Sequence, residues 1–104
     1  MKQVKGIDEL EGTRFFVYKH SNLCSISSGA HSVVSSLEAE LPCPVFKVIV
    51  HEDRELSSLV AQRFDVRHES PQLILVEGGR VIWHASHFDI TREAIRNSLK
   101  LSVL

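Results

Sequence analysis

The stretch that decides the fold is Arg14-Phe15-Phe16-Val17-Tyr18-Lys19-His20-Ser21-Asn22-Leu23-Cys24-Ser25-Ile26-Ser27. Its first part is continuously apolar, which is typical of a strand buried on both faces, so we expect a strand over residues 14–19. A helix-like pattern begins after Cys24. A cysteine at such a strand-to-helix junction suits disulfide chemistry, because the unpaired N–H groups of a helix N-terminus stabilise a thiolate.

Ser27 stands three residues after Cys24. Two-cysteine oxidoreductases carry a second thiol at that spacing, on the same face of the first helical turn, and it resolves a mixed disulfide from within. A hydroxyl cannot carry an electron pair away from sulfur. If Cys24 reacts with a disulfide, we therefore expect the protein to keep the adduct until another thiol releases it.

The next segments alternate between helix and strand patterns. Apolar residues at three- and four-residue spacings predict an amphipathic helix over residues 25–40, and the pattern stops at Pro42 and Pro44. The β-branched run 45–50 predicts a second strand. A second helix follows, with Glu52 and Asp53 near its start. Its expected apolar face consists of Leu56, Leu59, Val60 and Phe64.

The last third of the chain predicts a hairpin and a helix. Ser70-Pro71 precedes a strand over residues 72–76, and Gly78-Gly79 is a turn signal before the antiparallel partner 81–83. Thr91 is a typical N-cap, and Ile90 and Ile95 have the spacing of a hydrophobic staple. The order β-α-β-α-β-β-α predicts an α/β fold. Its mixed central sheet would have helices on both faces and parallel first strands joined by a right-handed crossover.

Length and composition restrict the class of protein. With 104 residues, 43% of them apolar, we expect one domain over residues 1–104. A net charge of −1 argues against a nucleic-acid-binding surface, and no apolar run is long enough for a membrane span. The first ten residues lack the apolar stretch of a signal peptide, so we expect a cytoplasmic protein.

The two cysteines are not expected to pair. A helix over residues 25–40 would hold Cys24 and Cys43 about 24 Å apart, whereas a disulfide needs Cα atoms within about 7 Å. Cys43 lies between two prolines, and we interpret it as a bystander or an occasional oxidation site.

These elements and residues together resemble the thioredoxin fold, and more closely the monothiol bacilliredoxins of the YtxJ family. The resemblance rests on Lys19-His20-Ser21, Cys24-Ser25-Ile26-Ser27, His68-Glu69-Ser70-Pro71-Gln72 and Trp83-His84-Ala85-Ser86-His87. It implies reduction of mixed disulfides between client proteins and bacillithiol, a small thiol that some bacteria use in place of glutathione. It also implies a cis bond between Ser70 and Pro71 beside Cys24, with backbone that binds an extended substrate.

Each residue near Cys24 can be interpreted as functional or as purely structural. Cys24 could be a buried structural thiol, but its polar neighbours, Ser25 among them, favour a reactive one. Ser27 is a helix-start residue or a hydrogen-bond donor to the thiolate. Ile26 is expected to shield the sulfur. Lys19 and His20 would add positive charge nearby, although residues at a strand end are more often solvated.

Two other functions stay open at this point. One is a glutaredoxin-like iron–sulfur carrier, and the other is a non-catalytic thioredoxin-fold binding module. The carrier is disfavoured because no glycine-rich loop follows the third strand beyond Gly78-Gly79. His84 and His87 have no clear partner ligands, so we expect neither a metal site nor a tightly bound cofactor.

Overall fold

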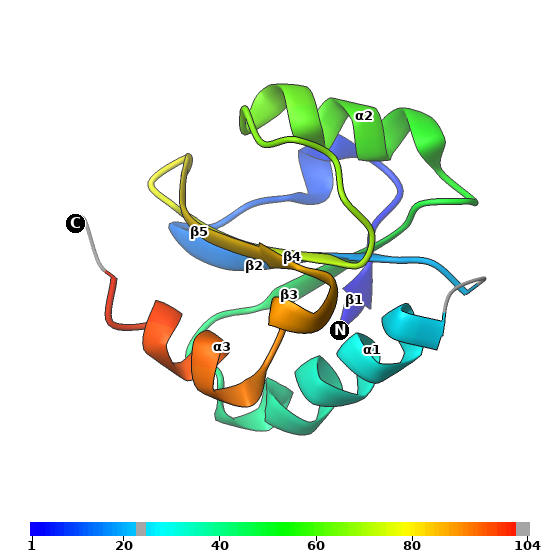
Figure 1. Cartoon of the computed structure of the whole chain (residues 1–104). Helices are drawn as coiled ribbons and strands as arrows, with labels where there is room; N and C mark the ends of the chain where they lie inside the picture. The colour runs from blue at the N-terminus through cyan, green and yellow to red at the C-terminus, as the bar shows by residue number, and fades with distance from the viewer. Residues whose placement is uncertain (23–24, 102–104) are drawn as a thin grey trace.

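A five-stranded sheet forms the centre of the computed structural model, which describes residues 1–22 and 25–101 (Figure 1). The strands lie in the order β1-β3-β2-β4-β5. Their bounds are β1 Lys2–Gln3, β2 Arg14–His20, β3 Val45–Ile49, β4 Gln72–Glu77 and β5 Arg80–Ser86. The α-helices are α1 Ser25–Leu37, α2 Arg54–Arg63 and α3 Arg92–Ser98, and three short 3-10 helices are η1 Ile7–Glu9, η2 Glu38–Glu40 and η3 His87–Asp89.

The strand directions confirm the predicted mixed sheet. β2 runs parallel to β3, while β4 is antiparallel to both β2 and β5. The β4–β5 turn contains Gly78 and Gly79 at φ values of 61° and 78°, which side chains other than glycine rarely adopt. β1 was not predicted. This strand has only two residues, too few to show a hydrophobic pattern, and it pairs in parallel with β3.

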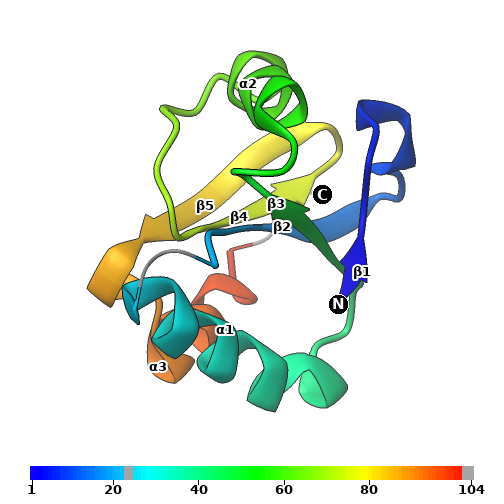
Figure 2. The same ribbon diagram turned by 90° about the vertical axis from the view of Figure 1, so that its right-hand side faces the viewer.

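Two hydrophobic cores lie on opposite faces of the sheet. α1 and α3 cover one face and α2 covers the other, as Figure 2 shows in a view turned by 90°. Alternate residues of β2 enter each core: Phe15 and Val17 pack toward α2, whereas Phe16 and Tyr18 pack toward α1 and α3. The predicted burial of this strand on both faces is therefore confirmed.

The helices differ from their predicted extent in two details. α1 ends at Leu37, and the next three residues tighten into η2, a common way for a helix to finish. Leu59 is 40% exposed and does not belong to the buried face of α2, which Leu56 and Val60 supply. Within residues 1–22 and 25–101, no helix is long and apolar enough to cross a membrane.

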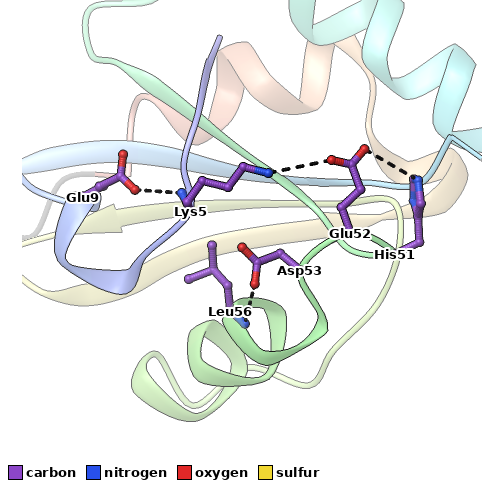
Figure 3. Close-up of polar contacts among 6 residues, drawn as sticks. All are labelled: Lys5, Glu9, His51, Glu52, Asp53 and Leu56. Carbon is purple, nitrogen blue, oxygen red and sulfur yellow. Dashed lines mark hydrogen bonds and ion pairs between the residues drawn. The ribbon is translucent and has the colours of Figure 1, made fainter.

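Polar contacts connect the N-terminal segment to the start of α2 (Figure 3). The Glu9 carboxylate accepts the backbone N–H of Lys5 at 2.7 Å, and Lys5 Nζ lies 3.7 Å from Glu52 Oε1. Asp53 caps α2 by accepting the backbone N–H of Leu56 at 3.3 Å. The ion pair is exposed and contributes little to stability, whereas the cap fixes where α2 begins.

Candidate active site

The strand and the helix that flank the predicted junction are both present. β2 ends at His20 and α1 begins at Ser25. Leu23 and Cys24 lie outside the described residues, so the assignment of Cys24 as the nucleophile stays a prediction. On the helical side, Ser25 is exposed and Ile26 is half-buried.

Ser27 connects the first turn of α1 to the end of β2. Its side chain is fully buried, and its Oγ accepts the backbone N–H of Ser21 at 3.3 Å. The Ser27 carbonyl accepts the hydroxyl of Tyr18 at 3.0 Å. These contacts support the helix-start interpretation. The accepting Oγ retains its own proton for donation, so hydrogen bonding to a Cys24 thiolate stays a prediction.

The Ser70–Pro71 peptide bond is cis, as predicted. Pro71 is buried directly before β4, where Gln72 pairs with Lys19 of β2. The Pro71 carbonyl accepts the backbone N–H of His87 at 3.0 Å, which connects the turn to η3. Pro71 thus lies one strand away from the end of β2. The predicted contact between Pro71 and Cys24 is not tested, because Cys24 is not among the described residues.

The prediction that Lys19 and His20 form a solvated strand end was wrong. β2 is covered on both faces up to its last residues, so Lys19 is fully buried and His20 is 8% exposed. Lys19 Nζ donates to the Ser57 carbonyl of α2 at 3.1 Å and lies 3.0 Å from His68 Nδ1. Burial lowers the pKa of Lys19 to about 8.

His68, an exposed residue of the segment that leads to Pro71, contacts this buried lysine through its ring nitrogen. Its Nδ1 also lies 3.2 Å from the hydroxyl of Ser57. Burial, and then the nearby Lys19 charge, lowers the pKa of His68, so the imidazole is neutral at pH 7. Three separate elements are thereby tied together. The sequence offered no signal for this, because a serine and a histidine that lie 38 and 49 residues after a lysine form no recognisable pattern.

A polar pocket of about 230 Å³ lies on the other side of β2, beside α1. Its lining consists of His20, Ser21, Asn22, Ser28, His31 and Ser32. The His20 and His31 rings lie next to each other, with centroids 4.9 Å apart and planes tilted by 55°. Burial is the main cause that lowers the pKa of both histidines. The pocket was missed from the sequence, although Ser28, His31 and Ser32 recur at helical spacing as a polar stripe.

Cys43 lies beyond the far end of α1, after η2. It is half-buried, and burial raises the pKa of its thiol. A thiol that stays protonated at pH 7 is a weak nucleophile. Across the described ranges, no three His, Cys, Asp or Glu side chains are grouped as metal ligands.

Solved structures with the same arrangement include one described as that of a candidate oxidoreductase with a thioredoxin fold. It is 29% identical, with a TM-score of 0.87, over 94% of this chain and 92% of that one. A mutant thioredoxin from Halobacterium salinarum is 19% identical, with a TM-score of 0.79, over 99% and 92% of the two chains. Fasciola hepatica thioredoxin is 18% identical, with a TM-score of 0.73, over 96% and 97%. The two thioredoxins, at these identities, show the fold alone.

The thioredoxin fold shared with the 29% identical structure, together with a match to a family model, identifies the chain as a thiol-disulfide oxidoreductase of the thioredoxin type. The family model described as monothiol bacilliredoxin BrxC matches residues 1–95. The chain belongs to this family, which agrees with the resemblance seen in its sequence.

Proposed function

We propose that the protein reduces mixed disulfides between client protein cysteines and bacillithiol, with Cys24 as its only reacting thiol. The family match over residues 1–95 carries this proposal. The position three residues after Cys24 supports it, because a buried, hydrogen-bonded serine stands there instead of a second thiol.

The reaction has two exchange steps. The Cys24 thiolate attacks the bacillithiol sulfur of the mixed disulfide, a new sulfur–sulfur bond forms, and the client leaves as a thiolate. A second bacillithiol thiolate then attacks the bacillithiol sulfur of the Cys24 adduct. Cys24 leaves as a thiolate, and bacillithiol disulfide carries away the oxidation.

The residues around the junction have separate roles in this scheme. The backbone at Ser70, before cis-Pro71, would bind the extended client chain. Ser27 would hold the helix start and donate to the thiolate, and half-buried Ile26 would shield the sulfur. The first N–H groups of α1, at Ser25 and beyond, stabilise negative charge at the helix start.

We assign Lys19 a role other than the expected one of adding positive charge near Cys24. Its ammonium group binds Ser57 and His68 on the α2 face, so we assign it to fixing the segment before Pro71. We place the reaction in the cytoplasm, because resolution by an external thiol needs a pool of reduced small thiols.

Intact mass spectrometry tests the proposal directly. Wild-type protein incubated with a bacillithiolated client should release the reduced client and carry one bacillithiol. Cys24→Ala should do neither, and Cys43→Ala should behave like the wild type. An adduct on Cys43, or no client release by a reduced and accessible Cys24, would overturn the proposal and favour a binding module.

A further inference from the structure

A groove of about 620 Å³ lies between the end of α2 and the β4–β5 turn, which are on the same side of the molecule (Figure 1). Three arginines line it: Arg63 ends α2, Arg67 follows in the segment toward β4, and Arg80 begins β5. With histidine counted as neutral, the three arginines and the one aspartate, Asp65, give the lining a net charge of +2, whereas the whole chain has −1. Positive charge is therefore concentrated at this place.

The arginines of this groove have few partners inside the protein. Within residues 1–22 and 25–101, no carboxylate forms an ion pair with Arg63 or Arg80. The Arg67 side chain is 92% exposed, and its Nε lies 3.9 Å from Glu69 Oε1. Like charges that are brought together repel one another, so an anionic group bound in the groove would offset this repulsion.

The end of α2 shapes one wall of the groove. The Val66 N–H donates to the Ala61 carbonyl at 3.1 Å, and the Asp65 N–H donates to the Gln62 carbonyl at 3.4 Å. These two bonds form a Schellman motif, and Asp65 has a φ of 50° at the position that glycine usually takes. The motif turns Val66 into the core, while Asp65 and Arg67 on either side of it stay exposed.

An irregularity in the sheet shapes the opposite wall. Val81 and His84 are three residues apart in β5, so a regular strand would place them on opposite faces. The pairing shifts between Leu75 and Val76, so that Val81 pairs with Val76 and His84 with Ile74. Both partners belong to the core on the α2 side. The shift therefore brings Val81 and His84 to the same face, where both line the groove.

The floor of the groove favours a peptide over a compact anion. Val66 is buried there, and Phe64 and Val81 are half-buried, so the floor is apolar. The helix C-terminus at this place carries partial negative charge, which would repel a phosphate that reached the floor. Carboxylates spread along a peptide can instead meet the exposed arginine side chains while an apolar side chain covers the floor. Arginine beside apolar surface is also typical of protein interfaces.

We propose that this groove, the arginine groove, docks an acidic segment of a partner protein, with one hydrophobic side chain of that segment on the apolar floor. The inference goes beyond the proposed exchange reaction and does not depend on it. The six residues of β4 span about 20 Å between Pro71 and the β4–β5 turn. A partner that is docked at the turn therefore leaves the Ser70–Pro71 side free.

Amide chemical shifts, followed by NMR during a titration, test the docking site. The probe is a short peptide of aspartate and glycine residues with one central phenylalanine. One control peptide has asparagine in place of aspartate, and another has alanine in place of phenylalanine. We expect the probe to shift residues 63–67 and 79–84, the alanine peptide to bind more weakly, and the asparagine peptide not to bind. Added salt should raise the Kd of the probe, because exposed charges are screened.

Three variants test the charges one at a time. Arg80→Gln should weaken binding about fivefold, and Asp65→Asn should tighten it about threefold, as expected for single exposed charges. Asparagine tolerates the left-handed conformation, so Asp65→Asn keeps the shape of the wall. Arg92→Gln removes the same charge from an exposed position of α3 outside the lining, so it should leave the Kd unchanged. Thermal unfolding verifies that each variant folds.

Four results would overturn the arginine groove as a docking site. They are the absence of shifts at the lining residues, equal binding of the asparagine peptide, an equal loss of affinity in Arg92→Gln and Arg80→Gln, and weaker binding in Asp65→Asn. Pyrophosphate serves as the compact anion: if it binds to the same residues more tightly than the probe, the groove is a phosphate site instead. None of these measurements involves Cys24, so each result leaves the exchange reaction standing.

Discussion

At the scale of single residues, Lys19 shows how burial changes chemistry. The Lys19 ammonium group is fully buried and contacts the Ser57 carbonyl and the His68 imidazole, and among the described residues no carboxylate forms an ion pair with it. Desolvation therefore disfavours its charged form and lowers its pKa from 10.5 to about 8. The protein holds this strained charge at the point where β2, α2 and the segment before Pro71 meet, which fits a positioning role better than a stabilising one.

The pH dependence of stability should report the Lys19 charge. Between pH 8 and 10.5 the unfolded chain binds more protons at this group than the folded chain, so wild-type stability should rise with pH relative to Lys19→Met. The full change is on the order of 3 kcal/mol, because a tenfold change in proton affinity corresponds to about 1.36 kcal/mol. Urea unfolding of both proteins at pH 7 and 10 measures it. A difference that stays constant with pH would show that Lys19 has the same pKa in the folded and the unfolded chain.

The acidity of Cys24 is the second prediction at this scale. We expect its thiol to ionise below the ordinary value of about 8.5, because the start of α1 favours the thiolate. The alkylation rate as a function of pH, measured in Cys43→Ala, isolates this thiol. Even in the wild type, Cys43 should add little to the alkylation at neutral pH, because burial raises the pKa of its thiol. An inflection at or above the ordinary value would contradict the activated nucleophile.

At the scale of elements, the sequence predicted what local patterns can encode. The continuous apolar run of β2, the glycine turn and the Thr91 cap all depend on neighbours within a few residues, and all are present. The buried group around Lys19 and the pocket at His31 depend on contacts between distant elements. Such contacts leave no period or spacing in the sequence. The sequence therefore predicted the local segments of the candidate site, but not the contacts between residues that are distant in the chain.

The N-cap of α3 offers a test of these local rules. Thr91 accepts the backbone N–H of Ala94 at 3.1 Å, and Ile90 and Ile95 on either side are both buried in the same core. Thr91→Ala should lower the free energy of unfolding by about 1 kcal/mol, because one N–H of the first turn loses its partner. Thr91→Asn should restore most of that loss. Equal stability of all three proteins in urea would show that the cap contributes nothing here.

At the scale of the whole molecule, the distance of Cys43 from the strand-to-helix junction supports the proposed reaction with one thiol. Cys43 follows α1 and η2, and the 13 residues of α1 alone span about 20 Å. The chain therefore separates Cys43 from the junction by the length of its longest helix. No described thiol near the junction can resolve an adduct, and Ser27 occupies the place where one would act.

Ser27→Cys should change this stoichiometry. The new thiol would stand in the first turn of α1, three residues from Cys24, where two side chains face the same side. Offered a bacillithiol mixed disulfide, the variant should release free bacillithiol and form an intramolecular disulfide. The wild type should keep its adduct until more thiol is added. Intact mass before and after alkylation distinguishes the two products, and Cys43→Ala in both backgrounds excludes the second native thiol.

Replacing Ser27 by cysteine should also lower the stability of the protein. Sulfur is larger than oxygen and a poorer hydrogen-bond acceptor, so the contact with the Ser21 N–H weakens and the variant should lose about 1 kcal/mol of stability. The dithiol form should nevertheless clear its adduct at a rate independent of thiol concentration, because the attacking group is intramolecular. If monomeric wild-type protein lacking Cys43 clears its own adduct without added thiol, resolution does not need an external thiol and the one-thiol mechanism fails.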